Sequence, residues 1–174
     1  MEFKLDRVIE VLSRTPAVLS SMLGGLSDAW VHGNYGDKTF SPFDVVGHLI
    51  HGERTDWMPR ARIILEHGES RTFDAFDRYA MFEENEGKTI GDLLAAFESL
   101  RRANVDQLRA LNLSAKQLEL KGTHPRLGGV TMKELIAMWV VHDLNHIGQI
   151  AKAMAFQFGE HVGPWHEHTS ILRK

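Results

Sequence analysis

The stretch TMKELIAMWVVHDLNHIGQIAKAM, residues 131–154, carries the clearest structural signal in the sequence. Thr131 followed three residues later by Glu134 forms a capping box, which marks the start of a helix. Few charged side chains follow within the stretch: Lys133, Glu134, Asp143 and Lys152. This pattern predicts a long helix that ends near Phe158, before Gly159, and is buried over most of its surface.

Polar side chains share one face of this predicted helix. They are His142, Asn145, His146 and Gln149. At about 100° per residue, the other three lie within roughly 60° of His142 around the helix axis. Apolar residues lie above and below them on the same face. The opposite side of the helix is apolar as well. Since such a helix is buried on both sides, we expect one side to face the core of this chain. The other side needs a second partner, either another part of this chain or a second subunit, and of these we expect a second subunit in a homodimer.

Three further segments show the helical spacing of apolar residues, at 5–23, 41–68 and 89–111. Pro16 and Pro59 lie inside the first two and predict a kink in each. The sequence contains no convincing alternating run of β-branched residues, so no strands are expected. We expect residues 112–131 to be a loop and residues 69–88 to be a long connection or a short irregular helix. We therefore predict an all-α fold, a four-helix bundle with long connections, forming a single domain over residues 1–174.

The composition excludes several classes of protein. With 174 residues, 43% hydrophobic residues and a net charge of −3, the chain has no electrostatic footprint for nucleic acid or an anionic membrane. Arg60, Arg62, Arg101 and Arg102 are expected on solvated helix faces. The absence of cysteine excludes disulfides and zinc–thiolate sites. No segment resembles a signal peptide or a membrane span, so a cytoplasmic protein is expected.

His142 and His146 suggest a metal site. Residues at i and i+4 project together from a helix, about 6 Å apart at their β-carbons, so their ring nitrogens can meet at one cation. A third ligand must come from another helix, and His48 is preferred because apolar residues surround it; His51, one turn further on, remains an alternative. A buried imidazole must be coordinated or hydrogen-bonded, so a hydrogen-bonded core pair is the competing interpretation.

The segment HDLNH, residues 142–146, also resembles the zinc-protease motif His-Glu-x-x-His. Asp143 stands where that motif has glutamate, and its side chain is one methylene shorter. No further ligand of that class follows at a suitable distance. A protease is therefore not expected.

Two longer motifs and a short one carry a resemblance to a known family. They are HLIHGE at 48–53, THPRLGGVTMKELIAMWVVHDLNHIGQIAKAM at 123–154 and VGPW at 162–165. In this order and spacing they resemble the DinB-like (DinB/YfiT) superfamily. The resemblance implies a four-helix bundle, commonly a homodimer, with three histidines that bind a divalent metal, zinc or nickel. Carried over to this chain, those ligands are His48, His142 and His146.

The resemblance also implies a class of activity. Characterised members are thiol S-transferases that use bacillithiol or mycothiol, and a mycothiol-dependent maleylpyruvate isomerase. Because this chain has no cysteine, a thiol would have to be a low-molecular-weight cosubstrate. We therefore expect a metal-dependent transferase with a thiol cosubstrate, and keep as alternatives a metal-dependent hydrolase and a non-catalytic, stress-associated metal-binding protein.

Several other residues have both a functional and a structural interpretation. Asn145 and Gln149 could orient a ligating imidazole or a bound water, or hydrogen-bond to each other within the bundle. His124 could reach over the site from a loop, or serve as a turn residue before Pro125. The remaining aromatic residues are expected to pack in or against the bundle: Trp57, Trp139, Trp165 and His166.

Overall fold

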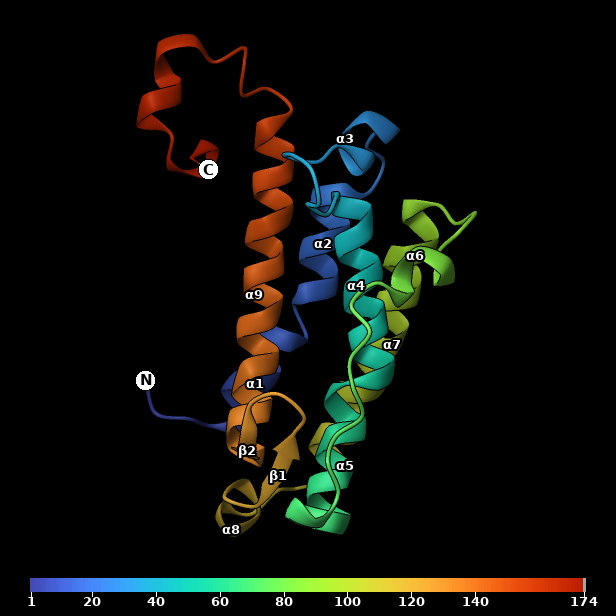
Figure 1. The fold of residues 1–174 in the computed structure, drawn as a ribbon, viewed down its shortest axis with the longest axis vertical. Helices are drawn as coiled ribbons and strands as arrows, with labels where there is room; N and C mark the ends of the chain where they lie inside the picture. Colours follow the sequence, from blue (N-terminus) through green and yellow to red (C-terminus); the bar gives the residue numbers. More distant parts are fainter. Residues whose placement is uncertain (174) are drawn as a thin grey trace.

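The computed structural model describes residues 1–173 and shows a helical bundle (Figure 1). Its four rods are α1 and α2 (Leu5–Leu12 and Thr15–Leu23), α4 and α5 (Pro42–Thr55 and Trp57–His67), α7 (Ile90–Ala110) and α9 (Met132–Phe156). Helix α9 packs against α1, α4 and α5, and α7 packs against α4 and α2. The predicted four-helix bundle is confirmed.

The first two rods are each broken near a proline, as predicted. The second rod is interrupted at Asp56, and Pro59 lies three residues beyond the break. Proline has no N–H to donate and its ring clashes with the carbonyl four residues earlier, which here belongs to Thr55, the last residue of α4. In the first rod, Pro16 lies in the first turn of α2, a position where its missing N–H is not needed.

Capping boxes set the starts of α4, α7 and α9. At the start of α9, the Glu134 backbone N–H donates to Thr131 Oγ1 at 3.1 Å, and the Thr131 N–H donates to Glu134 Oε2 at 2.7 Å. The same reciprocal bonds begin α4 at Ser41 and α7 at Thr89. Helix α4 carries His48, and α9 carries His142 and His146. By fixing the first residue of each helix, the caps also fix which face of the helix these histidines occupy.

The prediction that residues 112–131 contain no strand is wrong. Strand β1 (Lys121–His124) pairs antiparallel with β2 (Gly128–Thr131), and a short helix α8 (Ala115–Leu118) precedes them. The strands are only four residues long and glycine-rich, so they give no alternating signal. Gly122 is required by close packing, because a β-carbon there would lie 2.7 Å from the Phe73 ring and 2.8 Å from Ile64.

The other connections also hold short helices. They are α3 (Asp28–His32), η1 (Gly68–Ser70), α6 (Ala80–Glu84), η2 (Gly163–His168) and η3 (Ser170–Leu172). Figure 1 shows the C-terminal segment folding back beside the upper end of α9. Trp165 is 73% exposed, and His166 is exposed too, so the expectation that both pack against the bundle is wrong.

A buried polar layer separates two apolar clusters of the core. One cluster surrounds α1, α5 and the first half of α9; the other surrounds α2, α4 and the second half of α9. Between them, Arg101 of α7 donates to Glu53 Oε1 at 2.8 Å and to Asp143 Oδ1 at 2.9 Å. Arg101 is 1% exposed, so its expected place on a solvated face is wrong; it satisfies carboxylates from two neighbouring helices.

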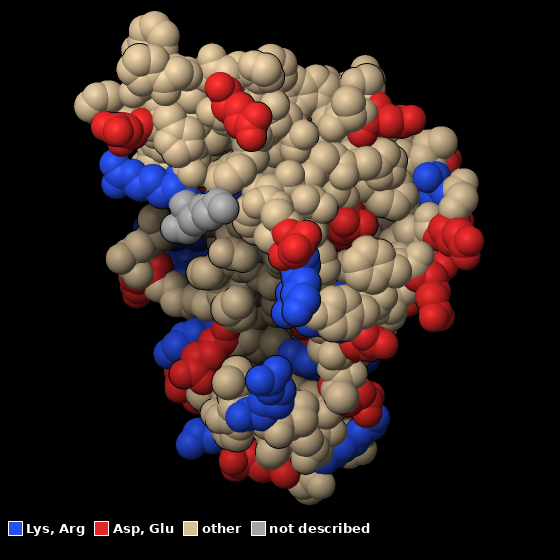
Figure 2. All heavy atoms as spheres, turned by 45° about the horizontal axis from the view of Figure 1, so that its top comes forward, with Lys and Arg blue, Asp and Glu red and all other residues tan. Residues whose placement is uncertain are grey.

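The surface carries both signs of charge. On the face in Figure 2, basic and acidic side chains are interspersed, with no broad area of one sign. Within residues 1–173, no helix combines the length and the apolar character that crossing a lipid bilayer requires.

Candidate metal centre

Three histidines meet between α4 and α9, which lie side by side in Figure 1. His48 comes from α4, and His142 and His146 come from successive turns of α9. The Nε2 atom of His142 lies 3.2 Å from that of His48 and 3.1 Å from that of His146. The structure thus brings together all three residues that the sequence nominates as ligands.

The spacing of these nitrogens suits a shared cation. Ligands at about 2.0–2.1 Å from a tetrahedral zinc ion are roughly 3.3 Å apart. Hydrogen bonding fixes one of the rings: His146 Nδ1 lies 2.8 Å from Gln149 Oε1, and an amide oxygen can only accept. His146 therefore carries its proton on Nδ1 and presents the Nε2 lone pair to the other two rings, as metal-ligating histidines do.

All three rings are held in the neutral form that coordination requires. Burial, with help from the charge of neighbouring His146 and Arg78, lowers the pKa of His48 to about 3. Burial likewise lowers the pKa of His142 to about 2. Burial also lowers the pKa of His146, although its bond to Gln149 works in the other direction. No proton therefore has to be displaced from these rings at neutral pH.

Aromatic rings hold the imidazoles in place. Phe76 meets His48 edge to face at 5.2 Å between ring centroids, and Trp57 meets His142 in the same way at 5.1 Å. Trp57 in turn stacks on Trp139 at 5.6 Å. Both tryptophans are almost fully buried, which confirms them as core aromatics. This packing limits the rotation of two of the three candidate ligands.

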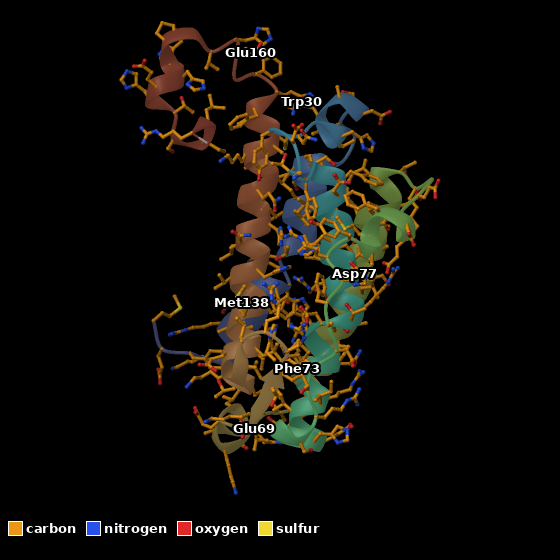
Figure 3. All side chains as sticks on the ribbon, viewed as in Figure 1. Trp30, Glu69, Phe73, Asp77, Met138 and Glu160 are labelled. Atoms are coloured by element: carbon orange, nitrogen blue, oxygen red, sulfur yellow. The ribbon has the colours of Figure 1, made fainter. Side chains whose placement is uncertain are left out.

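A cleft of about 480 Å³ opens onto the three histidines. Its lining comes from α4, α5 and the break between them, from α9, from the end of β1 and the hairpin turn, from the segment 75–78 and from the residues just before α4. The lining residues are Phe40, His48, Asp56, Arg60, Ala75, Phe76, Arg78, His124, Pro125, Arg126, His142, His146 and Gln149. Phe73 and Asp77, labelled in Figure 3, mark the segment that runs along α5 and α4 beside this cleft. The volume is within the range of small-molecule sites, roughly 300–1,000 Å³.

Comparison with known proteins identifies the family. The model of the DinB superfamily matches residues 12–150. The chain belongs to the DinB superfamily. Among solved structures it resembles YfiT from Bacillus subtilis, described as a probable metal-dependent hydrolase with an unusual four-helix bundle topology. The TM-score is 0.74 and the identity 24%, over 87% of this chain and 86% of that one. A search of curated proteins finds no match.

Other residues considered from the sequence have different places in this DinB fold. His51 lies against Glu84, with its Nδ1 2.9 Å from Glu84 Oε1, and is not part of the three-histidine cluster. Asn145 is exposed, and within residues 1–173 no hydrogen bond joins it to the histidines or to Gln149. Gln149 alone of that pair reaches a candidate ligand.

Asp143 and His124 also find defined partners. Asp143 is fully buried, and its carboxylate accepts from Arg101 and from Thr15 Oγ1 at 2.7 Å. That engagement removes the general base that a zinc-protease interpretation would need. His124 lies at the end of β1 and lines the cleft, as the interpretation that places it over the site requires.

Sequence reasoning missed several residues of the cleft. Asp56 and Arg60 form a buried ion pair at the break between α4 and α5, so the expectation that Arg60 lies on a solvated face is wrong. Arg78 and Arg126 come from connections whose path could not be built from a pattern. The break predicted at Pro59 was the one local signal near Asp56 and Arg60, because proline interrupts a helix close to its own position.

Proposed function

We propose that this DinB-superfamily protein is a metal-dependent hydrolase whose divalent ion, zinc or nickel, is held by His48, His142 and His146. The main support is the approach of three neutral imidazole nitrogens, 3.1–3.2 Å apart along the two measured pairs, at the base of an open cleft. Three histidines with an open position are typical of catalytic rather than structural zinc sites. The description of YfiT as a probable metal-dependent hydrolase agrees with this proposal.

The residues of this chain have separable tasks in such a reaction. His48, His142 and His146 would hold the divalent ion, which would supply Lewis acidity and a water nucleophile near neutral pH. Gln149 fixes the tautomer of His146, and the rings of Phe76 and Trp57 hold His48 and His142. The activity therefore depends on groups that orient ligands as well as on the ligands themselves.

Asp56 is the candidate for proton transfer. Burial raises the pKa of Asp56 from 3.8 to about 6, although the neighbouring Arg60 opposes the rise. A carboxyl with this pKa can take up or release a proton under physiological conditions, and it lines the same cleft as the histidines. We assign its carboxylate the role of general base toward the attacking water.

A second candidate is the thiol S-transferase that the family resemblance implies. The open coordination position could equally bind a thiolate, since a coordinating thiol is deprotonated outright. The chain contains no cysteine, so a low-molecular-weight thiol would enter through the cleft as a cosubstrate. A third possibility is metal binding without turnover.

Metal analysis and two assays separate these functions. The purified protein is expected to contain about one divalent ion per chain, measured by plasma mass spectrometry, and His48→Ala and His142→Ala to lose it. His51→Ala is the matched control, since His51 lies one turn from His48 and pairs with Glu84 instead. Full occupancy in both ligand variants would contradict the site.

The assays then test turnover on the same protein and variants. Metal-dependent cleavage of nitrophenyl esters, lost in the ligand variants, supports the hydrolase. Metal-dependent conjugation of a small thiol to monochlorobimane, without ester cleavage, supports the transferase. Metal binding with neither activity supports the non-catalytic alternative and contradicts the proposal.

A further inference from the structure

Arginines from three separate elements line the cleft above the histidines. Arg60 comes from α5, Arg78 from the segment before α6, and Arg126 from the hairpin turn. Among the described residues that line the cleft, Asp56 alone carries a carboxylate, and it is paired with Arg60. The chain as a whole has a net charge of −3, so this excess of positive charge is local.

The arginines are positioned by their surroundings. The guanidinium of Arg60 is buried and lies 5.4 Å from the ring centroid of Phe73. The guanidinium of Arg78 lies 5.3 Å from the ring of Phe40 and 5.4 Å from that of Tyr79. Stacking of this kind orients a guanidinium while leaving its N–H groups available for an anion.

Two of these cations have no acidic partner in the part of the chain that the structure describes. Within residues 1–173, salt bridges engage Arg54, Arg60, Arg71, Arg101 and Arg109, but neither Arg78 nor Arg126. Both residues are exposed and line the cleft. They can therefore meet an incoming anion without first breaking an internal ion pair.

His124 adds a neutral donor to the same wall. Its Nδ1 accepts from the backbone N–H groups of Arg126 at 3.1 Å and Leu127 at 3.2 Å. The neutral ring must then carry its proton on Nε2, which is free to donate. Burial, together with the charges of Arg60 and Arg126, lowers the pKa of His124 and so keeps the ring neutral.

The part of the cleft next to the histidines is apolar. The rings of Phe76 and Phe40 lie 5.2 Å and 6.0 Å from the ring of His48, centroid to centroid. Ala75 and Pro125 line the cleft further along. The cleft thus combines apolar surface beside the three histidines with donors and positive charge elsewhere in its lining.

We propose that this cleft selects a small substrate with an oxyanion group, a carboxylate or a phosphate, which Arg78 and Arg126 bind with support from Arg60. The rest of the substrate lies along Phe40 and Phe76, with its reactive group at the histidines; this placement rests on the proposed function. A charge-assisted hydrogen bond to a guanidinium contributes about tenfold or more in affinity. Arg78 and Arg126 are therefore each expected to raise the affinity for the anion about tenfold.

Calorimetric titration with matched probes tests this selectivity without requiring turnover. The probes are hydrocinnamate, its neutral amide hydrocinnamamide, and phenylphosphonate, added to the purified protein whose metal content has been measured. Hydrocinnamate is expected to bind at least about tenfold more tightly than the amide. Phenylphosphonate distinguishes the two oxyanions: whichever acid binds more tightly identifies the group, and either result supports the proposal.

Arginine variants separate binding by the cleft from binding by the metal alone. Arg78→Gln and Arg126→Gln are each expected to weaken acid binding about tenfold, without changing metal content or affinity for the amide. Arg102→Gln is the control, because Arg102 is exposed on α7 outside this cleft. The proposal is overturned if both acids bind no better than the amide, or if acid binding persists in the double variant. A wild-type protein that cleaves no ester but still binds the acids more tightly than the amide would contradict the proposed function and leave the anion selectivity intact.

Discussion

At the scale of single residues, the tautomer of His146 depends on Gln149. The Oε1 atom of Gln149 accepts from His146 Nδ1 at 2.8 Å, and within residues 1–173 no other acceptor for that proton is present. In Gln149→Leu the ring can move its proton to Nε2, the atom that faces His142. We expect about 10- to 100-fold weaker metal binding, measured by competition with a chromogenic chelator. Asn145→Leu, on the exposed side of the same helix, should bind metal as the wild type does.

Asp56 should control how activity depends on pH. The ionised carboxylate is the form that can accept a proton, so activity should rise as pH increases through about 6, the raised pKa of Asp56. Asp56→Asn is expected to lower kcat about a hundredfold or more and to remove this rise, with metal content unchanged. A pH–rate profile of both proteins at saturating substrate decides the point. An unchanged profile in the variant would assign the proton transfer to another group.

The same residue should also mark the pH dependence of stability. Burial raises the pKa of Asp56, so the folded state favours the protonated carboxyl. The associated stability is fully present below about pH 4 and is lost as pH rises through about 6, by about 3 kcal/mol in total. Relative to Asp56→Asn, the wild type should therefore lose free energy of unfolding by about this amount between about pH 4 and pH 7 in urea titrations. If the wild type instead gains free energy of unfolding relative to Asp56→Asn over this interval, the pKa of Asp56 is lowered by folding and the prediction is wrong.

The sequence predicts the residues of the site unequally. His142 and His146 could be nominated because helical spacing alone brings them together, and His48 because apolar neighbours surround it. Spacing could not separate Asn145 from Gln149, since both lie within the same arc of the helix and only the packing of α9 decides which is exposed. The place of Arg78 in the cleft lining depends on the course of a connection, which no local pattern encodes.

At the scale of helices, the polar layer joins all four rods. Arg101 of α7 bridges Glu53 of α4 and Asp143 of α9, and also donates to the carbonyl of Leu12, near the C-terminal end of α1, at 3.0 Å. Replacing Arg101 leaves two buried carboxylates without their cation. We expect Arg101→Met to lower the free energy of unfolding by about 3–5 kcal/mol in urea titrations.

The neighbouring residue provides the control for that measurement. Arg102 is exposed on the same helix, so Arg102→Met should change the free energy of unfolding by no more than about 0.5 kcal/mol. Similar values for the two variants would mean that the layer contributes no more than a surface arginine does.

The helices themselves were largely predictable, and the short elements were not. Capping boxes at Thr89 and Thr131 and the break near Pro59 are local signals, and each corresponds to a helix start or end in the structure. In the hairpin β1–β2, the missing side chain of Gly122 lets the backbone lie against Phe73 and Ile64. Arg101 was misassigned to a solvated face because its carboxylate partners are on other helices, far away in sequence.

At the scale of the whole molecule, one side of α9 has no partner within the described chain. Met138, Val141 and Leu144 are 49%, 56% and 53% exposed, and Met138 is labelled on this helix in Figure 3. Around Gly148 there is open space within 4 Å of where a β-carbon would be, so another helix could approach closely. Adjacent exposed apolar side chains on one helix face are characteristic of a protein interface.

We propose that a second copy of this chain covers that face. Helix α9 is long and the apolar side chains repeat at i, i+3 and i+6, so two copies can pack their stripes together about a two-fold axis. The purified protein is expected to sediment as a dimer. Val141→Glu and Leu144→Glu should each give a monomer with unchanged helical content, because a buried like charge would face itself across the axis. Leu127→Glu, which alters a 75% exposed residue in the hairpin turn, should remain dimeric. A wild type that sediments as a monomer at all concentrations would leave this face of α9 to some other partner.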